Sequence, residues 1–359
     1  MPLDFAKEAI ENTDTHSINF DELKAGKANI KVIGVGGCGC NAVTWLYNKG
    51  INGATVYAAN TDALHLSVTK SDDKILIGKE LTRGLGAGGK PQTGREAAKE
   101  AITDIKKVVT DSDMVFIIAG MGGGTGTGAA PVIAQLAKEA GAVVIGVVTM
   151  PFESEKARID KAEFGLQELR EQTDTCIVLD NNRLVDIAGQ LPIEQAFAVA
   201  NELVSTMIKG IVETITLPSL INLDYADVSS IMKNGGVAVI GIGESDTDNR
   251  VTEAVEQALN HPLLDVDYHG ATGALIHITC GPDLKLEEFD TVGRTISENL
   301  SPDAQVIIGA RIDKNFVGKV RVITIMTGVK SPYVLGKSTD KQAFPVSKEV
   351  SDLGIQVWE

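Results

Sequence analysis

The 359-residue sequence lacks the features of a membrane-spanning, secreted or disulfide-stabilised protein. No apolar run approaches the ~20 residues that a membrane-spanning helix needs. The first residues contain no basic segment followed by an apolar core, so we expect no signal peptide. The four cysteines, Cys38, Cys40, Cys176 and Cys280, have the spacing of neither a metal site nor a disulfide framework. These absences predict a protein of the reducing cytoplasm.

Basic residues are scarce relative to acidic ones. Lys and Arg total 33 against 48 Asp and Glu, which gives a formal net charge of −15. An acidic surface repels the phosphate backbone of nucleic acids and the headgroups of anionic lipids. We therefore expect no nucleic-acid binding and no direct insertion into a membrane.

Glycine, in contrast, gathers in three loops, of which the densest lies in residues 119–131. This stretch follows an apolar run at 114–118, which predicts a buried strand, and precedes a helical pattern at 132–140. Backbone without side chains lets N–H groups approach a phosphate closely, and the start of a helix adds a positive dipole end. The stretch therefore predicts an anion site, although a flexible Gly-rich linker has a similar composition.

The second and third glycine loops lie at residues 34–41 and 84–91. Gly34, Gly36 and Gly39 match the dinucleotide fingerprint, and Asp62 lies near the right distance for a ribose contact. An NAD-dependent oxidoreductase is therefore an alternative. Two features argue against it, because such a site needs one glycine loop and the later part of the chain lacks a catalytic His or Arg cluster. The sequence also has no Walker loop, so we expect backbone amides to hold the phosphates.

Strands alternate with helices in the first half of the chain, which predicts an α/β fold with a parallel sheet covered on both faces. In such sheets ligands bind at the carboxyl ends of the strands, where the glycine loops lie. The predicted strands span 28–35, 54–59, 74–77, 114–118, 142–148 and 175–179, and the predicted helices span 42–49, 94–109, 132–140 and 155–172.

A continuous apolar stripe predicts one long helix over 193–215, roughly 34 Å in length. We therefore expect a Rossmann-like parallel-sheet domain joined by a long central helix to a smaller α+β domain. The expected parts are an N-terminal extension at 1–28, a nucleotide-binding domain at 29–192, the central helix at 193–216, a C-terminal α+β domain at 217–328 and a tail at 329–359.

The tail has a polar part, at residues 329–351, and an apolar and aromatic ending at 352–359. An apolar segment after a solvated tether suggests a docking peptide for another protein. A terminal strand that packs on its own domain is the alternative.

An acidic loop follows the long helix at residues 222–227, Asn-Leu-Asp-Tyr-Ala-Asp. Asp224 and Asp227 are three residues apart and so share one face of a helix. Carboxylates in a first helical turn, with Asn222 as the cap, explain this pattern without any catalysis. We expect the loop to lie on the far side of the long helix from the glycine loops, too far to act on a nucleotide bound in the same chain.

Residues 122–128, Gly-Gly-Gly-Thr-Gly-Thr-Gly, resemble the signature loop of the tubulin/FtsZ family. Residues 34–41, 60–62 and 222–227 resemble further loops of that family, in the same order. The similarity covers residues 29–330 and is closer to FtsZ than to tubulin, with an archaeal-type member expected. It implies a GTPase that polymerises head to tail into protofilaments and builds the division ring at mid-cell.

The resemblance also implies the residues that bind the nucleotide. They are Gly36, Gly37, Cys38, Gly39, Cys40, Asn41, Asp62, Ala87, Gly88, Gly89, Gly122, Gly123, Gly124, Thr125, Gly126, Thr127, Glu155, Arg158, Asn181, Phe197 and Glu202. Among these, residues 87–89 match the loop that senses the γ-phosphate, and Glu155 and Arg158 match the pair that contacts ribose and phosphate. Phe197 matches the residue that packs on guanine, and Glu202 matches an acid, usually Asp, that reads the edge of the base.

Asp224 and Asp227, with Asn222, match the residues that act on the nucleotide of the neighbouring subunit. The resemblance implies GTP or GDP as ligand, Mg²⁺ bound mainly through phosphates and water, and K⁺ as a second candidate cation, with no side chains dedicated to a metal. It implies a second copy of the chain as partner, with a membrane-anchoring or division adaptor at the tail. A filament protein that binds nucleotide but hydrolyses it poorly remains an alternative.

The chain departs from the family pattern at three places. Cys38 and Cys40 stand where small residues are usual, so we expect Cys40 either to crowd the loop or to be sensitive to oxidation. The segment at 151–158 is one residue shorter than the common pattern, and the ending at 352–359 differs from the common bacterial tail peptide.

Overall fold

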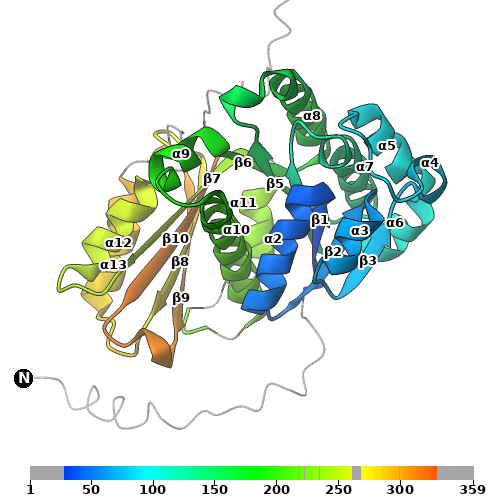
Figure 1. Ribbon diagram of the computed structural model, residues 1–359. Helices are drawn as coiled ribbons and strands as arrows, with labels where there is room; N and C mark the ends of the chain where they lie inside the picture. The colour runs from blue at the N-terminus through cyan, green and yellow to red at the C-terminus, as the bar shows by residue number, and fades with distance from the viewer. Residues whose placement is uncertain are drawn as a thin grey trace, which may run out of the picture.

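The computed structural model describes residues 28–217, 219–221, 223–233, 235–260, 268–298 and 300–329. Apart from residues 28 and 329, the expected N-terminal extension and the tail with its docking peptide lie outside the described residues. The described chain forms one ten-stranded sheet with helices packed on both faces (Figure 1).

The sheet has the strand order β3-β2-β1-β4-β5-β6-β7-β10-β8-β9. From β3 to β7 all neighbouring strands are parallel, whereas β10 is antiparallel to both β7 and β8, and β8 and β9 are parallel. The strands are β1 (Ile30–Val35), β2 (Ala54–Asn60), β3 (Asp73–Leu76), β4 (Met114–Gly120), β5 (Val143–Met150), β6 (Thr175–Asp180), β7 (Gly236–Ser245), β8 (Gly273–Cys280), β9 (Gln305–Ile312) and β10 (Val320–Thr327). Strands with helices on both faces are apolar along their length, which is why continuous apolar runs located them in the sequence.

The helices connect the strands in nearly the order expected. They are α2 (Gly36–Lys49), α3 (Ala63–Val68), α4 (Lys79–Thr82), α5 (Pro91–Glu100), α6 (Ile102–Val109), α7 (Thr125–Glu139), α8 (Ile159–Gln172), α9 (Asn181–Ala188), α10 (Ile193–Thr216), α11 (Tyr225–Met232), α12 (Arg250–Leu259) and α13 (Leu286–Ser297). Two short 3₁₀ helices, η2 (Glu153–Arg158) and η3 (Lys314–Phe316), complete the set in the described chain.

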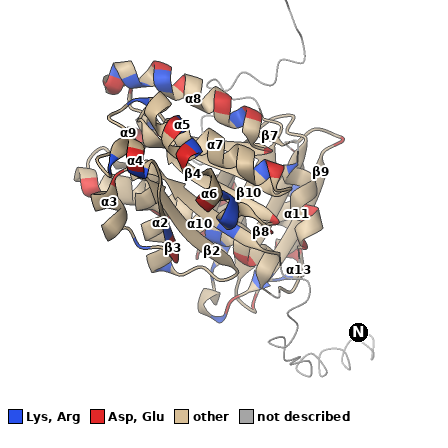
Figure 2. Cartoon of the chain, turned by 90° about the vertical axis from the view of Figure 1, so that its right-hand side faces the viewer, with Lys and Arg blue, Asp and Glu red and all other residues tan. Residues whose placement is uncertain are grey.

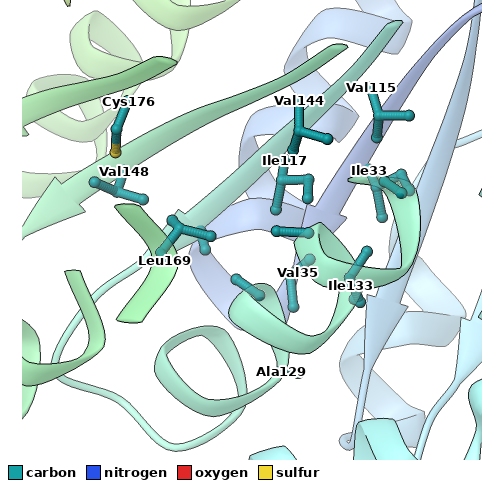
Figure 3. Packing of buried hydrophobic residues seen from close by; sticks show 14 of the residues in the cluster. Ile33, Val35, Val115, Ile117, Ala129, Ile133, Val144, Val148, Leu169 and Cys176 are labelled. Atoms are coloured by element: carbon teal, nitrogen blue, oxygen red, sulfur yellow. The ribbon is translucent and has the colours of Figure 1, made fainter. Parts of the chain in front are cut away.

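Two hydrophobic cores lie on the two faces of the parallel strands. One core packs α5, α6, α7 and α8 against the sheet, through residues such as Ile117, Ile133 and Leu169 (Figure 3). The other packs α2, α10 and α11 against the opposite face and includes Phe116 and Ile208. A third core lies between α12, α13 and the strands β8 and β10.

The long helix α10 contacts both halves of the sheet. Its C-terminal half belongs to the same core as Ile323 and Ile325 of β10. Its Glu213 carboxylate accepts a hydrogen bond of 2.7 Å from Arg311 of β9. We retain the division of the chain at the two ends of α10 as a proposal, because the sheet itself continues from β6 into β7.

All four helices predicted in the first half of the chain have different bounds in the structure, and the one expected at 132–140 begins at Thr125, inside the glycine stretch. The prediction of one helix over 94–109 is wrong, since α5 ends and α6 begins at Ala101, whose φ of −93° and ψ of 14° are not helical. The helix expected at 42–49 begins at Gly36, because the second glycine loop itself forms the first turn of α2. The helix expected at 155–172 is η2 followed by α8.

Charged residues lie mostly on the helices and loops, and the central strands are largely free of them (Figure 2). This distribution follows from the burial of the strands on both faces. No helix within the described ranges is long and apolar enough to cross a membrane.

Candidate active site

Three glycine-containing turns meet at the carboxyl ends of the parallel strands. Two follow β1 and β4 directly, and the third, at residues 84–91, comes after β3 and α4 and bonds to the short turn after β2 through Gly86 N and the Thr61 carbonyl oxygen. The hydroxyl groups of Thr61 and Thr125 lie 2.7 Å apart and join the turn after β2 to the turn after β4. The expected edge of the sheet therefore carries the glycine loops.

The turns after β1 and β4 touch through their backbones. Gly36 has a φ of +71°, and a Cβ there would lie 2.8 Å from the backbone nitrogen of Gly126. A Cβ on Gly126 would lie 2.6 Å from the carbonyl oxygen of Gly120. Neither position has room for a side chain. The N-termini of α2 and α7 are thereby held side by side, an arrangement that suits an anion because both helix dipoles present their positive ends.

The loop before α5 covers the same place. A Cβ on Gly124 would lie 2.9 Å from the backbone nitrogen of Lys90 and 3.2 Å from that of Gly89. Gly88 and Gly89 have φ values of +59° and +68°, a region that favours glycine. In contrast, a Cβ on Gly123 would meet nothing within 4 Å, so open space adjoins the cradle at this residue.

The two threonines of the signature loop point to different surroundings. Thr125 is partly exposed and bonds Thr61, as described above. Thr127 is 1% exposed, its hydroxyl has no hydrogen-bond partner, and its methyl group lies against Gly165 of α8. A contact between Thr127 and a ligand would therefore have to use its backbone.

The two cysteines of the first loop also differ. Cys40 is 0% exposed, Asn60 Nδ2 lies 3.7 Å from its sulfur, and burial raises the pKa of its thiol to about 11. A buried protonated thiol resists oxidation, which argues against a redox-sensitive Cys40. Cys38 is exposed, with its sulfur 3.4 Å from the hydroxyl of Thr149.

Two further polar residues predicted to bind the nucleotide hold the turns in place. Asp62 is the N-cap of α3 and accepts a hydrogen bond of 3.0 Å from the backbone nitrogen of His65. The His65 ring nitrogen Nε2 in turn lies 3.0 Å from Asn41 Oδ1 in the first half of α2. Asn41 therefore has a fixed position beside the cradle.

Further residues predicted to bind the nucleotide lie on η2, α9 and α10, and among them Arg158 of η2 lies against the cradle. Glu155 and Arg158 of η2 form an ion pair with each other, and the Cβ of Arg158 lies near Gly122. Phe197 of α10 is 40% exposed and meets Phe152 edge-on, with 6.1 Å between the ring centroids. Asn181 opens α9, directly after β6.

Glu202 of α10 faces α2. Its Oε2 accepts a hydrogen bond of 2.7 Å from the Trp45 indole, and its Oε1 pairs with the Lys49 ammonium. Burial raises the pKa of Glu202, but the hydrogen bonds from Lys49 and Trp45 outweigh this effect and hold the pKa below its ordinary value. The carboxylate is thus kept ionised.

The acidic loop lies at the opposite, amino-terminal ends of the parallel strands. The Tyr225 hydroxyl donates a hydrogen bond of 2.8 Å to the carbonyl oxygen of Asp113, the residue directly before β4. The glycine loop follows the far end of β4. Seven residues of strand separate the two places by roughly 20 Å, which agrees with the expected remoteness of the loop.

Asp224 and Asp227 form a capping box at the start of α11. The carboxylate of Asp224 accepts a hydrogen bond of 2.8 Å from the backbone nitrogen of Asp227. Asp224 is therefore the cap, and the expectation of Asn222 in that role is wrong, while Asn222 itself lies outside the described residues. Across the described ranges, no group of three or more His, Cys, Asp and Glu residues could hold a metal ion.

Several residues that the sequence reasoning passed over take part in these contacts, and Trp45, Lys49, Phe152 and Tyr225 are among them. Of these, Trp45 and Lys49 come first in the chain. The spacing of Asn41, Trp45 and Lys49 at i, i+4 and i+8 places them on one face of α2 and could have indicated the first two. No local signal pairs Tyr225 with Asp113, which lies 112 positions earlier.

The chain matches two family models. Residues 29–189 match the GTPase domain of the tubulin/FtsZ family, and residues 236–330 match the C-terminal domain of the FtsZ family. Among curated proteins, the cell division protein FtsZ 2 of Methanocaldococcus jannaschii is 53% identical over 350 residues, which cover 96% of this chain and 92% of that protein. The cell division protein FtsZ 2 of Halobacterium salinarum is 52% identical over 356 residues, with 98% and 90% coverage.

Solved structures agree. An empty FtsZ dimer of M. jannaschii superposes with a TM-score of 0.80 at 48% identity, covering 94% of this chain and 99% of that chain. A GTPγS-bound CetZ2 protofilament of Haloferax volcanii has a TM-score of 0.72 at 20% identity, over 84% of this chain and 93% of that one. At that identity the second likeness concerns the fold alone. None of these matches supports the oxidoreductase alternative.

Proposed function

The chain belongs to the tubulin/FtsZ family of GTPases, and we propose that it assembles head to tail and hydrolyses GTP at the contact between two subunits. Its relatives are archaeal cell division proteins, and a related structure is a dimer. The proposed role is a self-assembling cytoskeletal GTPase of cell division.

One observation carries the proposal of a shared site. Asp224 and Asp227 begin a helix tied to the start of β4, whereas the anion cradle follows the end of β4. The carboxylates are therefore too far to act on a phosphate held in the same chain. A second subunit stacked end to end, with the same orientation, would bring its acidic loop to the cradle of the first.

The chemistry of such a site follows from the groups present. Backbone N–H groups at the starts of α2 and α7 would hold the phosphates and offset the charge that develops during transfer. The carboxylates of Asp224 and Asp227, with Asn222, would orient the attacking water from the neighbouring subunit. Mg²⁺ bound through phosphate oxygens and water would neutralise further charge, with K⁺ as a second candidate cation.

The base end is proposed from two side chains. Phe197 presents an exposed ring face that could pack on guanine, while Glu202 offers an ionised acceptor to the donors on the edge of the base. Glu155, Arg158 and Asn181 are the proposed contacts to ribose and phosphate, supported by the position of Arg158 beside Gly122 and by its ion pair with Glu155.

We also propose that the filaments gather in a mid-cell division ring in the cytoplasm. The apolar ending at 352–359 is the proposed docking peptide for a membrane-anchoring or division adaptor protein. Its support is the pattern of an apolar segment after a polar tether, and it lies outside the described residues.

The dependence of GTP turnover on protein concentration tests the shared site. Turnover per subunit should rise steeply above a critical concentration and should coincide with light scattering from filaments. A turnover per subunit that is constant from dilute monomer to filament would contradict the proposal, because a site within one chain needs no neighbour.

A further inference from the structure

A chain of hydrogen bonds runs from the end of β2 to the first half of α2, through Asn60, His65 and Asn41. Asn60 is the last residue of β2 and is 2% exposed, His65 lies in α3, and Asn41 lies in α2 beside the cradle. Asn60 Nδ2 lies 3.5 Å from His65 Nδ1, and His65 Nε2 lies 3.0 Å from Asn41 Oδ1. The three side chains therefore depend on one another for their orientation.

The backbone after β2 fixes the orientation of the Asn60 amide. Asn60 Oδ1 accepts hydrogen bonds from the backbone nitrogens of Thr61 at 2.9 Å and Asp62 at 3.3 Å. A flipped amide would place its own N–H groups against these two donors and leave them unpaired. Asn60 Nδ2 must therefore point the other way, where the Cys40 sulfur lies at 3.7 Å and the His65 ring at 3.5 Å.

The Asn60 amide in turn selects the tautomer of His65. Because Asn60 Nδ2 is a donor, Nδ1 of the ring has to accept, and the proton of the neutral ring lies on Nε2. Nε2 is then the donor in its contact with Asn41, so the Asn41 atom that faces it has to be the acceptor Oδ1. The orientation of the Asn41 amide thus follows from two backbone N–H groups on another element.

This orientation leaves the amide nitrogen of Asn41 for a ligand. Asn41 is exposed, and its Nδ2 has no hydrogen-bond partner among the residues that the structure describes. A helical side chain points toward the N-terminus of its helix, so Asn41 lies over the turn that contains Gly37. The His65 ring lies there too, since a Cβ on Gly37 would be 3.5 Å from its Cε1. The Asn41 N–H groups therefore lie beside the unpaired backbone N–H groups of the first turn of α2.

We propose that His65 is a positioning residue, which through its tautomer holds Asn41 with the amide nitrogen, and not the carbonyl oxygen, toward the nucleotide. This inference rests on the proposed function, in which Asn41 contacts GTP or GDP. Phosphate oxygens and the carbonyl oxygen of guanine are both acceptors, so either can receive a bond from Nδ2, whereas a flipped amide would repel them. An amide that is oriented before binding also avoids the entropy cost of ordering it when the nucleotide arrives.

The tautomer of His65 is the first measurement, because it needs no nucleotide. Long-range proton–nitrogen correlation spectra of the full chain, labelled with nitrogen-15 in its histidines, show which ring nitrogen carries the proton. The chain has five histidines, and the signal that disappears in His65→Gln belongs to His65. In mildly alkaline buffer we expect the proton on Nε2. A proton on Nδ1 would overturn the inference.

Calorimetry with GDP tests whether His65 acts through Asn41. His65→Leu should weaken GDP binding roughly threefold to tenfold, the range for ordering one side chain. His65→Gln is the matched control and should bind GDP within about twofold of the wild type, since its amide nitrogen can replace Nε2 as the donor. In an Asn41→Ala background, His65→Leu should cause no further loss, because the side chain that His65 positions is gone. Thermal unfolding identifies any variant that fails to fold.

A diphosphate of 2-aminopurine riboside, which lacks the carbonyl oxygen of guanine, identifies the acceptor. If His65→Leu weakens this ligand as much as GDP, the bond from Asn41 goes to a phosphate. If the substitution leaves this ligand unaffected, the bond goes to the base. The two results support the same action of His65 and differ only in the atom that receives the bond.

Two calorimetric results would overturn the inference. One is wild-type GDP affinity in His65→Leu. The other is an equal loss from His65→Leu with and without Asn41, because a merely structural role of His65 does not need Asn41. Failure of the proposed function is distinguishable, since it would appear as no binding of GDP to the wild-type chain, whereas the tautomer of His65 is measured without nucleotide.

Discussion

The Tyr225 hydroxyl donates a hydrogen bond of 2.8 Å to the Asp113 carbonyl oxygen, and so ties the acidic loop to the start of β4. The glycine loop that forms the anion cradle follows the other end of the same strand. A single buried strand thus links two half-sites, one at each of its ends. Because β4 lies in the middle of the parallel strands, this separation is fixed by the core on both faces.

The acidic loop can be tested without loss of its helix cap. Asn caps helices about as well as Asp, and an Asn at position 227 can still accept the hydrogen bond from the Asp224 backbone nitrogen, so Asp224→Asn and Asp227→Asn should change the free energy of unfolding by less than about 0.5 kcal/mol. Both variants lose a carboxylate that would orient water, and GTP turnover should fall by about a hundredfold. GDP affinity, measured by calorimetry, should equal that of the wild type. Normal turnover in both variants would exclude these residues from catalysis.

Replacement by alanine should affect stability at one glycine of the signature loop and ligand binding at another. Gly126→Ala places a Cβ 2.6 Å from the Gly120 carbonyl oxygen and should destabilise the fold by about 1–3 kcal/mol. Gly123→Ala meets no neighbour and should leave the unfolding free energy within about 0.5 kcal/mol of wild type while weakening GDP binding. Urea denaturation and calorimetry measure both quantities. Unchanged GDP affinity in Gly123→Ala would mean that the ligand does not approach this residue.

Cysteine alkylation should map the same cradle. Burial raises the pKa of Cys40 and Cys280 to about 11 and that of Cys176 to about 12, so their thiols should stay unmodified in the native chain near pH 7. Desolvation raises the pKa of the Cys38 thiol as well, but Cys38 is the exposed one, beside Thr149, and should therefore react first with iodoacetamide, and bound GDP should protect it. Mass spectrometry locates the modified residue, and urea-unfolded protein labelled at all four cysteines is the control. Faster reaction at Cys40 than at Cys38 would contradict the placement.

The stability of the chain should depend on His277 at mildly acidic pH. Its side chain on β8 is buried, and burial together with the charge of Arg311 lowers its pKa from 6.5 to about 4. Above pH 6.5 the imidazole is neutral in both the folded and the unfolded chain, so its titration does not change the unfolding free energy. Between pH 6.5 and 4 only the unfolded state binds the proton, so the unfolding free energy should fall by about 3 kcal/mol in total. The difference in unfolding free energy between wild type and His277→Gln, measured from pH 7 to pH 4, isolates this effect from other groups. The same dependence of the unfolding free energy on pH in both proteins would refute it.

Much of the fold was predictable, because burial on both faces of a parallel sheet leaves continuous apolar runs such as those of β4 and β5. The apolar stripe of α10 was equally visible, since its period matches a helix that packs on one side. The break at Ala101 was not, as alanine carries no local signal for the end of a helix. The start of α2 at Gly36 was missed for a related reason. Glycine predicts a loop, and only the backbone of Gly126, 90 positions away, explains why a helix begins there without side chains.

The candidate site was predictable in its backbone and less so in its side chains. Glycine spacing indicated the cradle, because close approach to an anion and between loops excludes a Cβ. The sequence could not distinguish Thr125 from Thr127, since only the position of Gly165 on α8 decides that Thr127 is buried. The partners of Glu202 were also hidden, because they lie on another helix more than 150 positions earlier.

The central claim is that each active site needs two subunits, and mixing two inactive variants tests it most directly. Gly123→Asp places a carboxylate in the open space of the cradle and should block GTP binding while its acidic loop stays intact. Asp227→Asn should bind GTP but lack its own carboxylate for the next subunit. In the mixture, the GTP of an Asp227→Asn subunit can meet the intact acidic loop of a Gly123→Asp neighbour. We predict turnover severalfold above the sum of the two variants alone, and turnover equal to that sum, with both variants sedimenting in the same filaments, would contradict the account.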